Sequence, residues 1–291
     1  ALLQEGDEMR NLFILPFDHR GSLLKKLYGT TAPNAKQRQE YKRLKKMVYA
    51  GFEKSLELGV KKSEAALLVD EEYGSGILKD AKRKHYNFCM PVEKSGSEGF
   101  EFGHADFEKH VGKFNPTFVK VLVRLNPAND NSKAMEKLKK LDSFCKRSRR
   151  KYIFELLVPP TRAQSGIKTY DCDLRPELMV AAMEQLQNAG INPDVWKLEG
   201  VEKKSDVAAL VKQAKGAGII ILGRGESPAK VHKWLKTSAG VKGVVGFAVG
   251  RTVFWNAMLK MHSTVWKEQE AASEVAKNYF ALVKLWKKNQ R

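Results

Sequence analysis

The chain has 291 residues, of which 43% are hydrophobic, so its length and composition allow a sizeable core. It contains no apolar run near the roughly 20 residues that cross a membrane, and residues 1–10 lack the basic-then-apolar pattern of a secretory signal. We therefore expect a cytoplasmic protein. The sequence gives no C-x-x-C pair and no evident histidine cluster, which argues against a disulfide framework and a zinc site. Cys89 and Cys145, in apolar stretches, are expected to be core residues.

A formal net charge of +19 requires an explanation. Lysine and arginine are spread along segments in which apolar residues recur three and four positions apart, which is typical of the solvated outer face of amphipathic helices. These basic segments are residues 36–46, 133–151, 203–215 and 284–291. We therefore favour a solubilising role for the charge over a nucleic-acid surface, and expect it to attract phosphorylated metabolites.

In chain order, eight short apolar runs are predicted as strands, most of them followed by a segment with helical periodicity. The predicted strands are residues 11–18, 65–72, 88–94, 118–126, 152–159, 194–200, 218–225 and 243–251. Ser227 before Pro228 is predicted to cap the helix that follows the seventh strand. Eight strand–helix units favour one (β/α)8-barrel domain over residues 1–291. An open doubly wound sheet is the competing fold, but no G-x-G-x-x-G follows the first strand.

Nearly every predicted strand ends in charged or polar residues, although a parallel strand buried on both faces should be apolar throughout. In a barrel all eight carboxyl ends open onto one face, where barrel active sites form. We therefore expect these side chains to converge on one pocket. They include Asp18, His19, Arg20, Asp70, Glu71, Glu72, Glu93, Lys94, Arg124, Asn126, Lys197, Glu199, Arg224 and Arg251.

Three charged residues, Lys120, Glu155 and Lys197, lie inside predicted strands, where lysine and glutamate are rarely buried unless paired or functional. An internal ion pair is the purely structural interpretation. The chemical interpretation is a lysine whose amine becomes nucleophilic through burial beside a second cation, from Lys120 or Arg124 if Lys197 is the nucleophile. Glu155 would then serve as acid and base, and Asp18 would take a hydroxyl proton. Spacing alone does not decide which lysine forms the covalent bond.

The segments after the seventh and eighth predicted strands combine glycine with arginine, at residues 223–227 and 248–252. Barrels commonly bind phosphate at these two loops, where glycine permits close approach of the backbone and arginine offers a bidentate fork. A tight turn with a surface arginine is the alternative. The predicted phosphate or substrate ligands are Arg20, Arg124, Gly223, Arg224, Gly225, Gly250 and Arg251.

Long segments of the chain resemble a known family. They are LFILPFDHRGSL, LLVDEEYGSGIL, PVEKSG, VKVLVRLNP, FELLVPPT, DVWKLEG, ILGRG and GFAVGRTVFW. They resemble the aldolase-like domain fused to a kinase in some bacterial inositol-catabolism proteins, associated with cleavage of 2-deoxy-5-keto-gluconate 6-phosphate, and more distantly class I tagatose 1,6-bisphosphate aldolase. The resemblance implies a catalytic aspartate at Asp18, an active-site lysine at Lys120, a glutamate at Glu155 and the Schiff-base lysine at Lys197.

The implied reaction is retro-aldol cleavage of a phosphorylated keto sugar or sugar acid to dihydroxyacetone phosphate and an aldehyde such as malonate semialdehyde, with no metal or other cofactor. No kinase segment precedes the barrel in this sequence, so we expect the family's chemistry to carry over more closely than its substrate. The expected partner is the phosphorylated substrate, neither a membrane nor nucleic acid is expected, and assembly into a homo-oligomer is left open.

Two other functions are compatible with parts of the sequence. A metal-dependent aldolase or sugar-phosphate isomerase would use the acidic strand ends, with Asp70, Glu72, Glu93 and Glu199 as ligands. A basic nucleic-acid-binding protein would account for the charge, although the aromatic and basic motifs of single-strand binders are missing from the sequence.

Overall fold

The computed structural model describes residues 11–97 and 99–290, so the prediction made for residues 1–10 lies outside the described residues. Eight parallel strands, each paired with the next and the last with the first, close into a barrel. They are β1 (Leu12–Pro16), β2 (Ala65–Leu68), β3 (Asn87–Pro91), β4 (Phe118–Arg124), β5 (Lys151–Leu157), β6 (Val195–Glu199), β7 (Gly218–Leu222) and β8 (Val244–Ala248). The predicted (β/α)8 barrel is confirmed.

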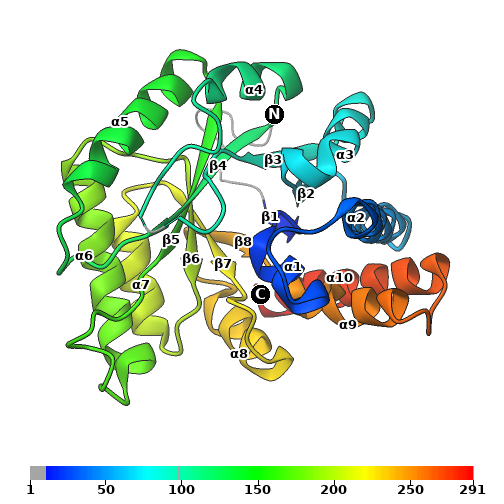
Figure 1. Cartoon of the computed structure of the whole chain (residues 1–291). Coiled ribbons are helices and arrows are strands. Elements are labelled where there is room, and N and C mark those ends of the chain that lie inside the picture. Colours follow the sequence, from blue (N-terminus) through cyan, green and yellow to red (C-terminus); the bar gives the residue numbers. More distant parts are fainter. Residues whose placement is uncertain (1–10, 98, 291) are drawn as a thin grey trace.

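Helices surround this barrel (Figure 1). They are α1 (Gly21–Tyr28), α2 (Ala35–Glu57), α3 (Glu71–Arg83), α4 (Phe107–Phe114), α5 (Ser132–Arg147), the short π-helix η1 (Tyr170–Leu174), α6 (Arg175–Asn188), α7 (Lys204–Gln213), α8 (Pro228–Ser238), α9 (Arg251–His262) and α10 (Glu268–Asn289). The side chain of Ser227 accepts a hydrogen bond from the Lys230 amide, which confirms the predicted cap of α8. No helix among the described residues has both the length and the apolar character needed to span a bilayer.

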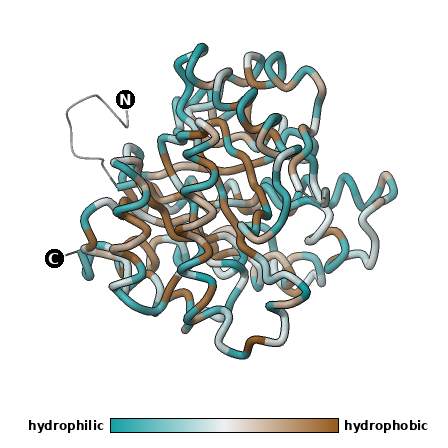
Figure 2. Tube along the Cα trace, turned by 90° about the vertical axis from the view of Figure 1, so that its left-hand side faces the viewer, coloured by the Kyte–Doolittle hydropathy of each residue, from teal (hydrophilic) through white to brown (hydrophobic). Residues whose placement is uncertain are grey.

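Alternation along the strands divides the core into two layers, as expected when successive side chains point to opposite faces. One set of apolar side chains fills the barrel interior and includes Ile14, Cys89 and Val195. The larger set, to which Cys145 belongs, packs between the strands and the helices. Figure 2 shows the hydrophobic strands at the centre and hydrophilic positions concentrated in the outer helices. Both predicted core cysteines are buried.

Most strands end before the polar residues that closed each predicted range. β1 stops at Pro16 and β2 at Leu68, whereas the predictions ran to residues 18 and 72. The charged residues therefore lie on the loops or helix starts just beyond the sheet. β4, β5 and β6 are exceptions because they carry charged residues inside the ladder, and Glu155 of β5 pairs in register with Lys197 of β6.

One basic residue assigned to a solvated helix face is buried. Lys45 lies on the inner side of α2, where it forms an ion pair with Asp70 and is 1% exposed, as is its partner. The Lys45 ammonium also lies over the rings of Tyr41 and Tyr73, at 5.1 and 5.7 Å from their centroids. The other carboxylate oxygen of Asp70 caps α3 by accepting the Tyr73 amide. Burial without a partner would be costly for either charge, so this pair fixes α2 against the start of α3.

Replacing Asp70 with asparagine is expected to lower the free energy of unfolding by about 3–5 kcal/mol, because asparagine can still cap α3 but leaves the Lys45 charge buried and unpaired. Denaturant unfolding at neutral pH measures the effect. The matched control is Glu72→Gln, because the neighbouring carboxylate pairs with Arg38 in a half-exposed ion pair, for which a change within about 1 kcal/mol is expected. Equal losses in the two variants would contradict the assignment.

Candidate active site

A pocket of about 870 Å³ opens at the carboxyl ends of the strands. This volume is within the usual range for small-molecule sites. The structure places all the predicted catalytic and phosphate-binding residues in its lining, namely Asp18, Arg20, Lys120, Arg124, Glu155, Lys197, Gly223, Arg224, Gly225, Gly250 and Arg251. The convergence expected from the strand ends is present for most of the residues named, whereas Asp70, Glu71, Asn126 and Glu199 do not belong to the lining. The role of each residue remains a prediction.

Glu155 lies between the two lysines of the pocket. Its Oε2 atom is 2.8 Å from Nζ of Lys120 and 2.9 Å from Nζ of Lys197. Three adjacent strands create this arrangement, because Leu122 of β4 pairs with Glu155 and Glu155 pairs with Lys197. The three charged side chains are at most 9% exposed. One carboxylate is therefore shared by two amines in a site from which most water is excluded.

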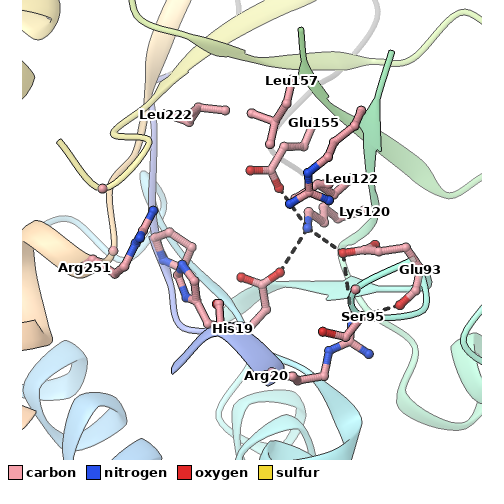
Figure 3. Close-up of a pocket in the computed structure, with 18 of the residues that line it drawn as sticks. His19, Arg20, Glu93, Ser95, Lys120, Leu122, Glu155, Leu157, Leu222 and Arg251 are labelled. Atoms are coloured by element: carbon pink, nitrogen blue, oxygen red, sulfur yellow. Dashed lines mark hydrogen bonds and ion pairs between the residues drawn. The ribbon is translucent and has the colours of Figure 1, made fainter. Parts of the chain in front are cut away.

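Lys120 is the more heavily paired of the two amines, and Figure 3 shows it among its carboxylate partners. Besides Glu155, it contacts Asp18 at 3.0 Å and Glu93 at 2.7 Å. Burial acts to lower the pKa of this amine, but the attraction of its three carboxylates outweighs burial and holds the pKa of Lys120 well above its ordinary value. Lys120 is therefore a fixed cation.

The carboxylates of this cluster are held in their charged form. Burial acts to raise the pKa of Glu155, but Lys120 and Lys197 more than compensate and lower it. The pKa of Asp18 is likewise lowered, because attraction by the two lysines outweighs burial. Lys197, by contrast, has one carboxylate within ion-pair distance among the described residues. The two lysines are thus distinguished by their surroundings, which their strand positions did not indicate.

Two buried polar atoms of the pocket lining, Nδ1 of His19 and Oε2 of Glu93, have no hydrogen-bond partner among the described residues. Burial lowers the pKa of His19 to about 4, although Asp18 opposes the shift, so the imidazole is neutral near pH 7. The Tyr41 hydroxyl donates to the backbone carbonyl of His19 at 2.7 Å. These two atoms are available to polar groups of a bound molecule. His19 was recognised in the sequence only as one of the polar strand ends.

The two glycine–arginine turns lie against each other on one side of the mouth, because β7 and β8 are neighbouring strands. Arg251, the first residue of α9, donates from Nη2 to the carbonyl of Arg224 at 2.7 Å. Gly225 has φ +79°, which strains other residues, and a Cβ there would lie 2.1 Å from Cζ of Arg251, so a side chain at this position would displace the guanidinium. Burial lowers the pKa of Arg251 and Glu155 raises it, but a guanidinium stays charged at any physiological pH.

Arg224 is already occupied by protein carboxylates. Its guanidinium contacts Asp171 at 2.7 Å and Glu199 at 3.2 Å. Arg175, which is 1% exposed, joins the same two acids from the start of α6. Arg175 was not identified from the sequence, where a charge just after a polar turn gives no sign of burial. Arg224 thus anchors the turn, which leaves Arg251 as the freer guanidinium on this side.

The acidic ligand set proposed for a metal-dependent enzyme is not assembled. Asp70 pairs with Lys45, Glu72 with Arg38, Glu93 with Lys120 and Glu199 with Arg224, so each carboxylate has its own cation. Asp70 is also directed into the packing between α2 and α3, away from the pocket lining.

The expectation that the histidines do not cluster is wrong. Two of them, His104 and His110, stack on each other beside Glu71. The sequence does not bring these residues together, because the contact depends on how the segment after β3 folds against α3.

The fold and the pocket define a parallel (β/α)8-barrel protein with a buried lysine–carboxylate site at the carboxyl ends of its strands. A family model described as "Uncharacterized protein conserved in bacteria (DUF2090)" matches residues 3–290, and the chain belongs to that family. A search of curated proteins finds no match.

Several solved structures share the barrel. A Schiff-base-forming fructose-1,6-bisphosphate aldolase superposes with a TM-score of 0.59 and 14% identity, covering 95% of this chain and 94% of that one. An archaeal fructose-1,6-bisphosphate aldolase, with its catalytic lysine bound to the carbinolamine intermediate, superposes with a TM-score of 0.58 and 13% identity, covering 95% of this chain and 94% of that one. Cgl0159 from Corynebacterium glutamicum superposes with a TM-score of 0.61 and 17% identity, covering 97% of this chain and 88% of that one. With sequence identities of 13–17%, these structural likenesses establish the fold alone.

The lowered pKa of His19 should make stability depend on pH between 6.5 and about 4. In this window the histidine of the unfolded chain is protonated while the folded one is not, so stability falls as the pH is lowered, by about 3 kcal/mol in total. Denaturant unfolding at pH 7 and pH 4.5 measures this loss. His19→Asn should reduce it, whereas the same replacement at the exposed His232 should not; an unchanged pH dependence in His19→Asn would refute the prediction.

Proposed function

We propose that the protein is a class I aldolase that forms a Schiff base through Lys197 and cleaves a phosphorylated keto sugar or sugar acid. The observation that carries the proposal is the single carboxylate of Glu155 held between two buried lysines, one of which is a fixed cation. Lys120 is held by three carboxylates, whereas Lys197 contacts one among the described residues, so the Lys197 amine is the less constrained of the two for attack on a carbonyl. Lys197 is therefore the better nucleophile, and Lys120 the charged neighbour.

The geometry supports an order of events. The Lys197 amine attacks the keto carbon, and Glu155 at 2.9 Å is in position to move protons during addition and during loss of water. The resulting iminium accepts the electron pair of the breaking carbon–carbon bond, while Asp18 takes the proton of the hydroxyl that becomes the aldehyde. Protonation of the enamine and addition of water to the imine then release the ketone and restore the amine.

The likenesses support the same chemistry. The two superposed aldolases act on fructose 1,6-bisphosphate, one described as Schiff-base-forming and the other with its lysine in covalent linkage. We carry over the reaction class, and not that substrate. The sequence resemblance to the inositol-catabolism domain favours 2-deoxy-5-keto-gluconate 6-phosphate, with dihydroxyacetone phosphate and malonate semialdehyde as products.

Phosphate would bind between the glycine–arginine turns. The N-terminus of α9, the positive end of its helix dipole, lies at the second of these turns, and Arg251 is the first residue of the helix. His19 Nδ1 and Glu93 Oε2 are then left to bind hydroxyl groups of the substrate chain. Arg20 lies at the opposite part of the pocket, where it donates to the Glu93 carbonyl at 2.9 Å, and adds positive charge for an acid group.

Borohydride reduction in the presence of dihydroxyacetone phosphate tests the covalent step by a permanent gain in protein mass. Lys197→Ala should abolish the gain, because the attacking amine is lost. Lys120→Ala should retain partial trapping while turnover falls by about 10²–10⁴. Lys94→Ala, an exposed lysine in the same pocket lining, is the control and should trap normally. Trapping that survives in Lys197→Ala but is lost in Lys120→Ala would reverse the two assignments.

Arg251→Ala is expected to raise KM for a phosphorylated substrate by about 10–100-fold, which corresponds to the loss of a charge-assisted hydrogen bond. kcat should change less, because the phosphate lies away from the reacting carbons. Steady-state kinetics should be compared with Arg124→Ala, an exposed arginine of the same mouth. A larger rise in Arg124→Ala would move the phosphate site to the end of β4.

A further inference from the structure

Outside the pocket, three potential metal ligands meet where the segment after β3 packs on α3. Glu71 begins α3, His104 lies in the segment before α4, and His110 lies in α4. Oε2 of Glu71 is 2.5 Å from Nδ1 of His110 and 3.9 Å from Nε2 of His104. The two imidazole rings are stacked, with centroids 3.9 Å apart and planes at 10°. One potential ligand atom from each residue lies within 4.8 Å of the others.

We propose that Glu71, His104 and His110 form a binding site for a transition-metal ion, with Zn²⁺ as the best match. Two imidazole nitrogens and one carboxylate oxygen suit zinc and its neighbours, whereas calcium and magnesium prefer oxygen ligands alone. A metal ion would replace the short contact between Glu71 and His110, and the two rings would have to turn out of their parallel stack so that both nitrogen lone pairs meet at the ion. His104 is 54% exposed at its side chain, which leaves room for water in the remaining position.

The groups around these ligands are arranged as in metal sites. Asp106 Oδ1 is 3.5 Å from Nε2 of His110, the ring nitrogen that would not bind the ion. Metal-binding histidines usually direct their second nitrogen at such a carboxylate, which orients the ring. Lys113 contacts Oε1 of Glu71 at 3.0 Å and leaves Oε2 for the ion.

An ion pair between Glu71 and His110 would be the simpler interpretation. It accounts for those two residues and for Lys113, and ring stacking holds His104 against His110, but neither requires the Nε2 atom of His104 to lie 3.9 Å from the same carboxylate oxygen. A shared ligand accounts for all three.

The site is structural in character, because none of its three ligands lines the pocket. Its effect on the pocket would pass through the segment between β3 and α4. That segment folds back on itself, with the Lys94 amide donating to Glu101 and the Gly103 amide donating to Val92, both at 2.8 Å. Ser95 and Ser97, near the tip of this segment, line the pocket. His104 lies two residues after Phe102, which pairs antiparallel with Glu93 as the segment returns. A bound metal would therefore fasten this wall of the pocket to α3.

Isothermal titration of the untagged, chelator-treated protein with ZnCl₂ tests the proposal independently of any aldolase activity. One ion per chain is expected, and His104→Ala, His110→Ala and Glu71→Gln should each weaken binding by at least about tenfold, as should Asp106→Ala, in line with the usual effect of losing an orienting partner. His232→Ala, a matched change at an exposed histidine of α8, should bind as the unaltered chain does. Circular dichroism confirms that each variant is folded.

Absence of zinc binding, or equal binding by the three ligand variants and the His232 control, would overturn the site. The fastening of the wall has its own readout, which is chymotrypsin cleavage after Phe100 or Phe102. Zinc should slow this cleavage in the unaltered chain and not in His104→Ala. Zinc bound at the three residues without any protection would overturn the structural role.

Discussion

The site depends on the cost of burying charge inside β4, β5 and β6. Two lysines and a glutamate in the barrel wall are tolerated only because each has an opposite charge within about 3 Å. The parallel register fixes which groups meet, because Glu155 is paired along the sheet with Lys197 and with Leu122, two residues from Lys120. Asp18 and Glu93 complete the balance from the ends of β1 and β3.

Much of this arrangement could be predicted from the sequence because its signals are local. Apolar runs at regular intervals predicted the strands, and a charge inside such a run, as at Glu155 or Lys197, predicted a buried charged cluster. The predicted ends of the strands were less accurate than their positions, because apolar residues continue past the last hydrogen bond between neighbouring strands. Lys45 shows the limit of helical periodicity: one lysine in a basic helix is buried, and only its contact with Asp70 explains which one.

Residues that depend on contacts between distant segments were beyond such reasoning. Arg224 and Arg251 look equivalent in the sequence, because each stands beside glycine. In the structure Arg224 is paired with Asp171 and Glu199, whereas Arg251 forms no ion pair with a described residue and donates to the Arg224 carbonyl. The stacked histidines arise in the same way, from a hairpin and a helix whose packing no local pattern encodes. Local patterns thus located the pocket, while pairing across elements separates anchoring residues from those free to bind a ligand.

Lys120 holds three carboxylates that come from alternate strands, so it joins three parts of the barrel mouth at one nitrogen atom. Loss of the Lys120 amine would leave three carboxylates facing each other without their shared cation. Loss of one carboxylate would remove a negative charge and leave the remaining charges of the cluster differently balanced. Evolution can therefore alter this centre only by compensated changes at several positions. The arginines of the two glycine–arginine turns form no ion pair with these three carboxylates among the described residues, so substitutions at the rim should be tolerated more readily than substitutions in the lysine centre.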